Sequence, residues 1–167
     1  LDLCRQIAPR LHEMKVGRVI ARPFIGAPGA FERTGNRHDY AIDPPSPTLT
    51  DWVQGAGREV RAVGKIGDIF SMRGIDTVKK GPDAALMEHL IADIADAPEG
   101  SLTFANFVEF DSLYGHRRDI AGYARALEWF DAQVPRMLAG LRDGDLIVFT
   151  ADHGNDPSWT GTDHTRE

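Results

Sequence analysis

The sequence has a single cysteine, Cys4, and therefore cannot form an internal disulfide. Such scarcity is typical of proteins in a reducing compartment, so we expect a cytoplasmic protein. No apolar run approaches the roughly 18 residues of a membrane-spanning helix. The net charge of −6 leaves no excess of Lys and Arg for binding phosphates of nucleic acid. We expect neither a nucleic-acid nor a membrane partner.

The composition, 42% hydrophobic and 26% charged over 167 residues, is typical of a globular protein of one domain or slightly more. The chain begins at Leu1, without an initiator Met or a signal-peptide pattern, inside a stretch with helical spacing. We therefore expect it to be a piece of a longer protein. Nothing in the sequence indicates an oligomeric state.

The N-terminal third is the less regular part of the chain. Apolar residues at helical spacing predict a helix over residues 1–14, bent or broken near Pro9. A strand is expected within residues 16–22, followed by a loop-rich stretch over 23–47 that ends in a cluster of prolines. This cluster is the best linker candidate. We expect one domain to end there, so that residues 1–44 and 45–167 belong to different domains.

The second part alternates strand and helix patterns. Helices are expected over residues 48–56, 83–96 and 120–141, the last kinked at Pro135, and strands over 60–63, 102–110 and 146–150. The last two strands are too apolar for an exposed sheet. This alternation predicts an α/β fold with a mostly parallel sheet covered by helices on both faces.

Residues that bind metal ions follow both apolar strands. The first strand leads into Asp111 and His116, the second into Asp152 and His153, and His164 lies shortly beyond. Open α/β sheets place their chemistry beyond the carboxyl ends of their strands. Carboxylate oxygen mixed with imidazole nitrogen suits Mn²⁺, Zn²⁺ or Mg²⁺, with Mn²⁺ favoured. The residue pattern alone leaves an alternative, because a capping Asp beside a surface His is common.

Other polar residues near these positions have two interpretations. Asp119, Asp156, Thr162 and Asp163 could hold the second ring nitrogen of a metal-binding histidine. Each is also a plausible cap or turn residue, and we favour this interpretation for Asp119 and Asp156.

Three motifs resemble those of the phosphopentomutases, which belong to the alkaline phosphatase superfamily. They are DSLYGHRRD at 111–119, TADHGNDP at 150–157 and GTDHTRE at 161–167. The second motif alone indicates only the superfamily, whereas the other two are more particular. Segments at 17–24, 33–40 and 64–69 extend the resemblance over most of the chain.

The resemblance implies an alkaline-phosphatase-like core with two Mn²⁺ ions. Asp111, His116 and His164 would hold one ion, and Asp152 and His153 the other, together with an Asp from the N-terminal part of the family's sequence. The nucleophile of the family is a threonine, phosphorylated in the active enzyme, which would also lie upstream of this chain. A sugar bisphosphate is expected as the activator. We therefore expect the isolated chain to be inactive.

The resemblance also implies a substrate and a cap. Residues 1–44 would be part of a smaller α/β cap domain that covers the substrate. Arg18 and Arg33 of this cap, and next Lys65 of the core, would bind the phosphate of a pentose phosphate. The implied reaction interconverts ribose 1-phosphate and ribose 5-phosphate, and the deoxyribose forms. The alternatives are another sugar-phosphate mutase or phosphatase of the superfamily, or a metal-binding fragment without catalysis.

Overall fold

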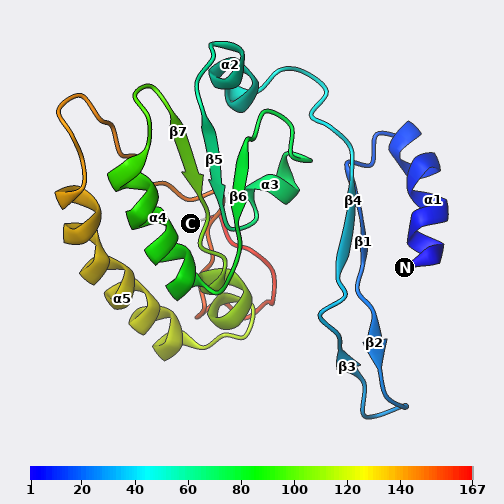
Figure 1. Cartoon of the computed structure of the whole chain (residues 1–167). Helices are drawn as coiled ribbons and strands as arrows, with labels where there is room; N and C mark the ends of the chain where they lie inside the picture. Colours follow the sequence, from blue (N-terminus) through cyan, green and yellow to red (C-terminus); the bar gives the residue numbers. More distant parts are fainter. Residues whose placement is uncertain (167) are drawn as a thin grey trace.

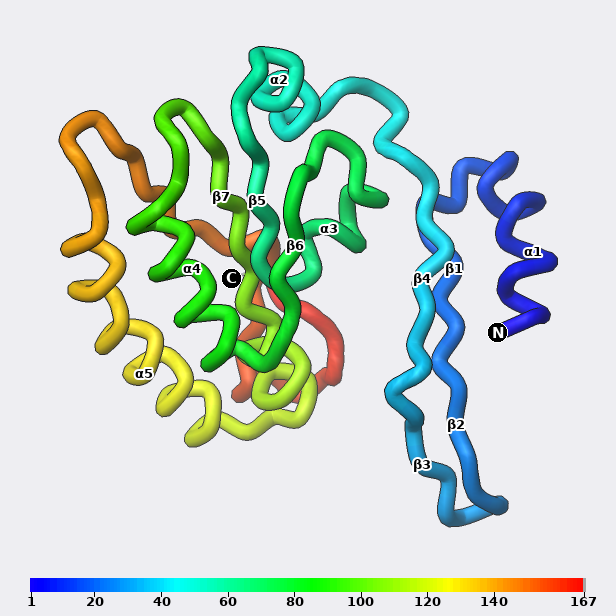
Figure 2. The backbone as a smooth tube through the Cα atoms, viewed as in Figure 1, coloured from blue at the N-terminus to red at the C-terminus, as the bar shows by residue number. Residues whose placement is uncertain are grey.

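A computed structural model describes residues 1–166 (Figures 1 and 2). The N-terminal part consists of helix α1 and four short strands: α1 (Asp2–Glu13), β1 (Arg18–Ala21), β2 (Phe24–Ile25), β3 (Glu32–Arg33) and β4 (His38–Ala41). The helix runs on through Pro9, so the predicted break is absent. Helix α1 contacts β1 and β4, and in Figure 1 this unit lies to one side of the remaining chain.

The stretch predicted as loop-rich contains a long hairpin instead. β1 pairs with β4 and β2 with β3, both antiparallel. The hairpin reverses near Gly26, where φ is +108° and an added Cβ would lie 2.2 Å from the carbonyl oxygen of Ala30. Phe24 and Phe31 pack edge to face across it at 5.0 Å. Cross-strand pairing of this kind leaves no periodic signal in such short segments. These strands were therefore not predicted, although most of residues 23–47 are loop, as expected.

The larger part of the chain is an α/β unit built around a small parallel sheet. Its elements are α2 (Leu49–Gly55), β5 (Val60–Val63), α3 (Ile66–Ile69), β6 (Thr77–Lys79), α4 (Asp83–Asp96), β7 (Leu102–Ala105), the π-helix η1 (Phe110–Gly115) and α5 (Ile120–Ala139). The strand order is β6-β5-β7, and both pairs are parallel. Helix α4 packs on β5 and β7 and against α5, while α3 contacts β5 and lies on the opposite side in Figure 1.

The central strand β5 forms the core of this unit. Val60, Ala62 and Val63 are each at most 1% exposed, which agrees with the predicted buried strand. Ile66 and Ile75 pack with them, and Leu86 of α4 is also buried. The prediction of a parallel α/β sheet with helices is thus confirmed at this level, although the sheet has only three strands among the described residues.

Two predicted strands differ from the structure. The strand expected over 102–110 ends at Ala105, because the chain turns at Asn106 toward η1. The segment 146–150 forms no strand: no β-ladder joins it to another part of the described chain, and Leu146 is 85% exposed. Apolar composition predicts burial, but a strand also needs a neighbour for its backbone hydrogen bonds. The prediction for 146–150 was therefore wrong for this chain.

The carboxyl ends of β5 and β7 are tied together. The backbone N–H of Lys65 donates to the side-chain oxygen of Asn106 at 3.0 Å. Gly64 has φ +88°, and a Cβ there would lie 2.4 Å from the backbone oxygen of Asn106. This close approach requires glycine. It brings Lys65 and the segment that leads to Asp111 to the same edge of the sheet, where open α/β sheets carry their sites. No helix within residues 1–166 is long and apolar enough to cross a membrane.

Candidate metal centre

Asp111 lies in η1, and the chain before it is held in place by a pair of carboxylates. Asp83, at the start of α4 and 4% exposed, accepts hydrogen bonds from the backbone N–H groups of Val108 (3.2 Å) and Glu109 (3.0 Å). The Glu109 carboxylate in turn accepts from the N–H of Asp83 at 3.2 Å. Burial, with the nearby charge of Glu109, raises the pKa of Asp83 to about 6. This reciprocal contact fixes the approach of the chain to Asp111.

Asp111 and two histidines converge. Asp111 Oδ1 lies 3.3 Å from His116 Nε2 and 3.2 Å from His164 Nε2. The rings of the two histidines are 4.9 Å apart. The sequence separates His164 far from Asp111, and the C-terminal segment brings it back beside η1, as the red trace in Figure 1 shows. These three predicted residues therefore lie together.

His153 joins this cluster, whereas Asp152 points away. The His153 ring stacks on His164 with centroids 3.7 Å apart, and donor atoms of Asp111, His153 and His164 all lie within 4.8 Å of one another. The side chain of Asp152 is 82% exposed and 3.7 Å from His153 Nε2. Four of the five predicted residues are thus close to one another, and Asp152 lies beside them on the surface.

Hydrogen bonds to backbone carbonyls orient two of the rings. His116 Nδ1 lies 2.7 Å from the carbonyl oxygen of Thr162, and His153 Nδ1 lies 3.0 Å from that of Gly154. A carbonyl oxygen only accepts, so Nδ1 carries the proton in both rings. The lone pair of each neutral ring is then on Nε2, as metal-binding histidines require. Thr162 therefore acts as predicted, although through its carbonyl.

The donor set fits a divalent cation. Ligand atoms about 2.1 Å from one ion lie roughly 3.0–3.4 Å from each other in octahedral or tetrahedral geometry. The distances from Asp111 Oδ1 to the two histidines, 3.2 and 3.3 Å, agree with this spacing. One carboxylate oxygen with imidazole nitrogens suits Mn²⁺ or Zn²⁺. The described residues thus offer a mixed oxygen and nitrogen site for a metal ion.

The two acidic residues for which we favoured a structural role have it. Asp119 caps α5 by accepting from the N–H of Gly122 at 2.8 Å. Asp156 accepts from both the N–H and the hydroxyl of Ser158, and the hydroxyl bond is the largest cause of its lowered pKa. Neither carboxylate bonds to a histidine. Asp163 accepts from the N–H of His164 at 3.0 Å.

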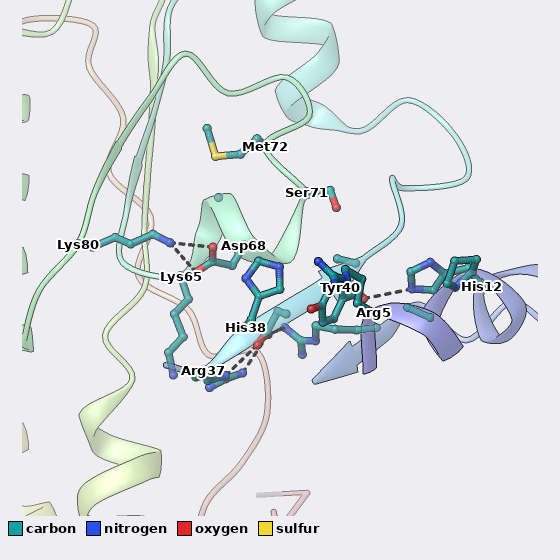
Figure 3. A pocket seen from close by; sticks show the side chains of 16 residues that line it. Arg5, His12, Arg37, His38, Tyr40, Lys65, Asp68, Ser71, Met72 and Lys80 are labelled. Carbon is teal, nitrogen blue, oxygen red and sulfur yellow. Dashed lines mark hydrogen bonds and ion pairs between the residues drawn. The ribbon is translucent and has the colours of Figure 1, made fainter. Parts of the chain in front are cut away.

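A cavity of about 670 Å³ separates the N-terminal unit from the sheet (Figure 3). It is lined by α1, by β1 and β4, and by the segment from Lys65 to Met72. Arg18 and Lys65, two of the three predicted substrate-binding residues, line it together. Arg33 lies elsewhere, in a smaller cavity at the end of the hairpin with Arg22 and Phe31.

Positive charge predominates in the larger cavity. Arg5, Arg18, Arg37, Lys65 and Lys80 face only two carboxylates, those of Asp39 and Asp68. Lys80 pairs with Asp68 at 2.7 Å, and Arg37 pairs with Asp39 through two bonds of 2.8 and 3.0 Å. Burial would raise the pKa of Asp39, but Arg37, with Arg18 and Arg22, holds it below its ordinary value.

Two cationic residues of this cavity, Arg18 and Lys65, make weaker ionic contacts than the others. Arg18 Nη1 lies 3.5 Å from Asp39, which already pairs with Arg37. The Lys65 ammonium makes no hydrogen bond or ion pair to any described residue. In Figure 3 the side chains of Lys65 and Arg37 extend toward the same region. Cations that outnumber the carboxylates in a concave site attract an anionic ligand.

Two further residues at the candidate metal centre, Asn155 and Arg118, were not predicted from the sequence. Asn155 donates to Asp111 Oδ1 at 2.6 Å. Arg118 donates to several oxygens of the loop that carries His153 and His164. Both residues lie inside the motifs that contain the predicted ligands. Their position next to predicted ligands was the one available signal.

Comparison with known proteins identifies the class. The profile of the Metalloenzyme superfamily matches residues 14–167, and the chain belongs to this superfamily. More particularly, it is 56% identical to a phosphopentomutase of Chelativorans sp. (strain BNC1) over 99% of the chain and 41% of that protein. It is 54% identical to the phosphopentomutase of Sinorhizobium medicae (strain WSM419), again over 99% of the chain and 41% of the relative.

A phosphopentomutase of Rhizobium meliloti (strain 1021) is 53% identical over 100% of the chain and 42% of its own length. The resemblance to phosphopentomutases inferred from the motifs is therefore confirmed. The chain spans about two fifths of the length of these curated relatives.

Proposed function

We propose that this chain is part of a phosphopentomutase that interconverts ribose 1-phosphate and ribose 5-phosphate, and the deoxyribose forms. The observation that carries the proposal is the convergence of Asp111, His116, His153 and His164 in a chain about 54% identical to such enzymes. Residues 45–167 would belong to the alkaline-phosphatase-like core, and residues 1–44 to a cap domain over the substrate.

Two Mn²⁺ ions would occupy the centre. Asp111, His116 and His164 would hold one, and Asp152 and His153 the other, with a further carboxylate from a part of the protein outside this chain. A pair of such ions, when bound, neutralises phosphate charge and stabilises the attacking and leaving oxygens of an in-line displacement. The exposure of Asp152 is compatible with this division, because its carboxylate is available to a second ion.

Hydrogen bonds within the chain orient the proposed metal ligands. The carbonyls of Thr162 and Gly154 keep the protons of His116 and His153 on Nδ1, so that Nε2 presents its lone pair. Asn155 fixes Asp111 Oδ1 by a hydrogen bond of 2.6 Å. Preorganised ligands of this kind reduce the free-energy cost of ordering the centre when it binds the ion and the phosphate.

The cationic cavity would bind the phosphate of the pentose. Arg18 suits it because a guanidinium donates two parallel hydrogen bonds to phosphate oxygens. Lys65 suits it because its ammonium makes no hydrogen bond or ion pair to a described residue and because Lys65 lies at the carboxyl end of β5. The proposed role of Arg33 rests on the resemblance alone, since Arg33 lies in a separate cavity.

The rest of the reaction would need residues outside this chain. A threonine phosphorylated in the active enzyme would transfer its phosphoryl group to the pentose phosphate and so form a sugar bisphosphate. The phosphoryl group at the other position of the bisphosphate would then return to the threonine, and added bisphosphate would serve as the activator. The enzyme would work in the cytoplasm. A non-catalytic metal-binding role remains the alternative for the isolated chain, because this segment lacks the proposed nucleophile.

The proposal is tested by ³¹P NMR on the full-length protein with Mn²⁺, ribose 1-phosphate and a catalytic amount of ribose 1,5-bisphosphate. We expect the resonance of ribose 5-phosphate to grow at the expense of that of ribose 1-phosphate, and the His153→Ala variant to be inactive. Release of inorganic phosphate without ribose 5-phosphate would identify a phosphatase instead. Turnover by the isolated 167-residue chain, above its own His153→Ala control, would show that the nucleophile lies within it.

A further inference from the structure

Arg118 connects the two segments that carry the candidate ligands. It follows His116 closely, and its guanidinium donates to four oxygens of the C-terminal loop. These are the carbonyl oxygens of Gly161, Asp156 (2.8 Å) and Asp163 (2.9 Å), and the side-chain oxygen of Asn155 (3.4 Å). This loop begins beside His153 and ends beside His164. All the charge-assisted bonds of Arg118 therefore act on the segment that supplies the other two histidines.

The backbone at Arg118 is held in an unfavourable conformation. Its φ is 55°, in the left-handed region that non-glycine residues seldom adopt. The guanidinium bonds to the loop come from this strained residue, whose conformation must be imposed by its surroundings.

Asn155 continues the connection to the ligand on the other segment. Its side-chain oxygen accepts from Arg118, while its nitrogen donates to Asp111 Oδ1 at 2.6 Å. The amide packs so closely on η1 that a Cβ at Gly115 would lie 2.1 Å from it. The amide orientation is thus fixed by two different partners. A chain of contacts runs from Arg118 through Asn155 to Asp111.

We propose that Arg118 is a positioning residue that holds His153 and His164 in place beside Asp111 and His116. The inference rests on the proposed function, because it assumes that these four side chains bind metal. Arg118 itself touches neither ion nor substrate in this account. It acts through the carbonyls of the loop and through Asn155.

The direction of the change in metal affinity distinguishes a positioning role of Arg118 from a direct effect of its charge. A guanidinium near a divalent cation repels it, so loss of the charge alone would strengthen metal binding. Loss of the positioning contacts would weaken it, because outer-shell partners typically contribute 10- to 100-fold in metal affinity. The two effects have opposite directions. A weaker affinity on removal of Arg118 therefore reports positioning.

The test measures Mn²⁺ affinity of the full-length protein by isothermal titration calorimetry. We expect Arg118→Ala to weaken binding roughly 10- to 100-fold. Arg118→Lys keeps the charge but not the planar fork, so it should recover only a minor part of the affinity. The matched control is Arg117→Ala, which removes the same charge from an exposed neighbour and should leave the affinity near the wild-type value.

Hydrogen exchange of the metal-free protein provides a second measurement. Amides of residues 153–166 should exchange faster in Arg118→Ala than in the wild type, while those of β5 should not change. Should Arg118→Ala fail to fold, Asn155→Ala tests the same connection, and it too should weaken Mn²⁺ binding.

The outcomes distinguish the inference from the proposed function. Wild-type protein that binds Mn²⁺, with an Arg118→Ala variant of equal affinity and equal exchange, would overturn the inference alone. Wild-type protein that binds no divalent cation would overturn the proposed function and the inference together.

Discussion

Asp111 Oδ1 lies 3.2 Å from His164 Nε2, a distance that suits two ligands of one ion. If they bind Mn²⁺ in the folded chain only, the ion must stabilise the fold. At a free concentration one hundred times its Kd, the expected gain in the free energy of unfolding is about 2.7 kcal/mol. We expect thermal unfolding of the full-length protein to show this gain, and Asp111→Ala to lower the gain by removing a ligand of one of the two ions.

The matched control for this experiment is Asp131→Ala, which removes a carboxylate from the exposed side of α5. Its response to Mn²⁺ should equal that of the wild type. An Asp111→Ala variant that retains the whole gain would exclude Asp111 as a ligand.

Arg18 and Asp152 should have separable roles. Arg18→Ala removes a charge-assisted hydrogen bond to phosphate, worth on the order of 1.5–3 kcal/mol, so kcat/KM should fall roughly 10- to 150-fold with the Mn²⁺ content unchanged. Asp152→Ala should lower the Mn²⁺ content and nearly abolish turnover. Metal analysis and steady-state kinetics on the full-length protein compare the two.

The control for Arg18 is Arg10→Ala, which removes the same charge from an exposed position on α1 outside the cavity. Equal loss of bound Mn²⁺ in the Arg18 and Asp152 variants would contradict the division of roles. Arg18 would then be structural.

The contribution of Asp83 to the free energy of unfolding should fall as the pH rises through the acidic range. Its carboxyl has a pKa of about 6 in the folded chain, compared with an ordinary value of 3.8. Burial and the charge of Glu109 raise this pKa, while hydrogen bonds to two backbone N–H groups and the charge of Lys65 oppose the shift. The folded chain therefore binds this proton more tightly than the unfolded chain. Between about pH 4 and pH 6 the contribution to stability falls, by about 3 kcal/mol in total.

Urea unfolding of the full-length protein as a function of pH measures this effect. Asp83→Asn does not titrate, so the difference in unfolding free energy between wild type and variant should shrink as the pH rises from 4 to 6. Asp143→Asn removes a carboxylate from the exposed turn after α5 and serves as the control. A pH-independent difference for Asp83→Asn would refute the raised pKa.

Gly115 should be intolerant of a side chain. A Cβ there would lie 2.1 Å from the Asn155 amide, which is itself bonded to Asp111 and Arg118. Gly115→Ala should therefore cost about 1–3 kcal/mol of stability and also weaken Mn²⁺ binding. Gly55→Ala, where a Cβ meets open space, should be neutral or slightly stabilising. Equal stability of the two variants in urea would contradict the packing described for Asn155.

Three of the helices in the α/β unit, and its central strand, could be predicted because their apolar residues follow the pattern of the element. The helix expected over 83–96 has the predicted bounds, and Val60–Val63 forms the buried strand. The proximity of Asp111 to His164 was also predicted, from the motifs together with their place beyond strand-like segments. Such predictions depend on local pattern and on resemblance.

What the sequence did not predict depends on partners distant along the chain. In the sequence Arg118 is one of two adjacent arginines, and nothing distinguishes it from Arg117. The folded chain shows that Arg118 donates to the carbonyl oxygens of Gly161 and Asp163, while Arg117 is exposed. The apolar run 146–150 reads as a strand, but strand formation requires a neighbour that pairs with it. Composition carries no information about that neighbour.

The most direct test of the metal centre is a crystal structure of the full-length protein grown with Mn²⁺, with diffraction data collected at the manganese absorption edge. We expect two anomalous peaks. One should lie within about 2.0–2.2 Å of ligand atoms of Asp111, His116 and His164, and the other at the same distance from ligand atoms of Asp152 and His153. Peaks bound by other residues, or no peak beside Asp111, would contradict this expectation.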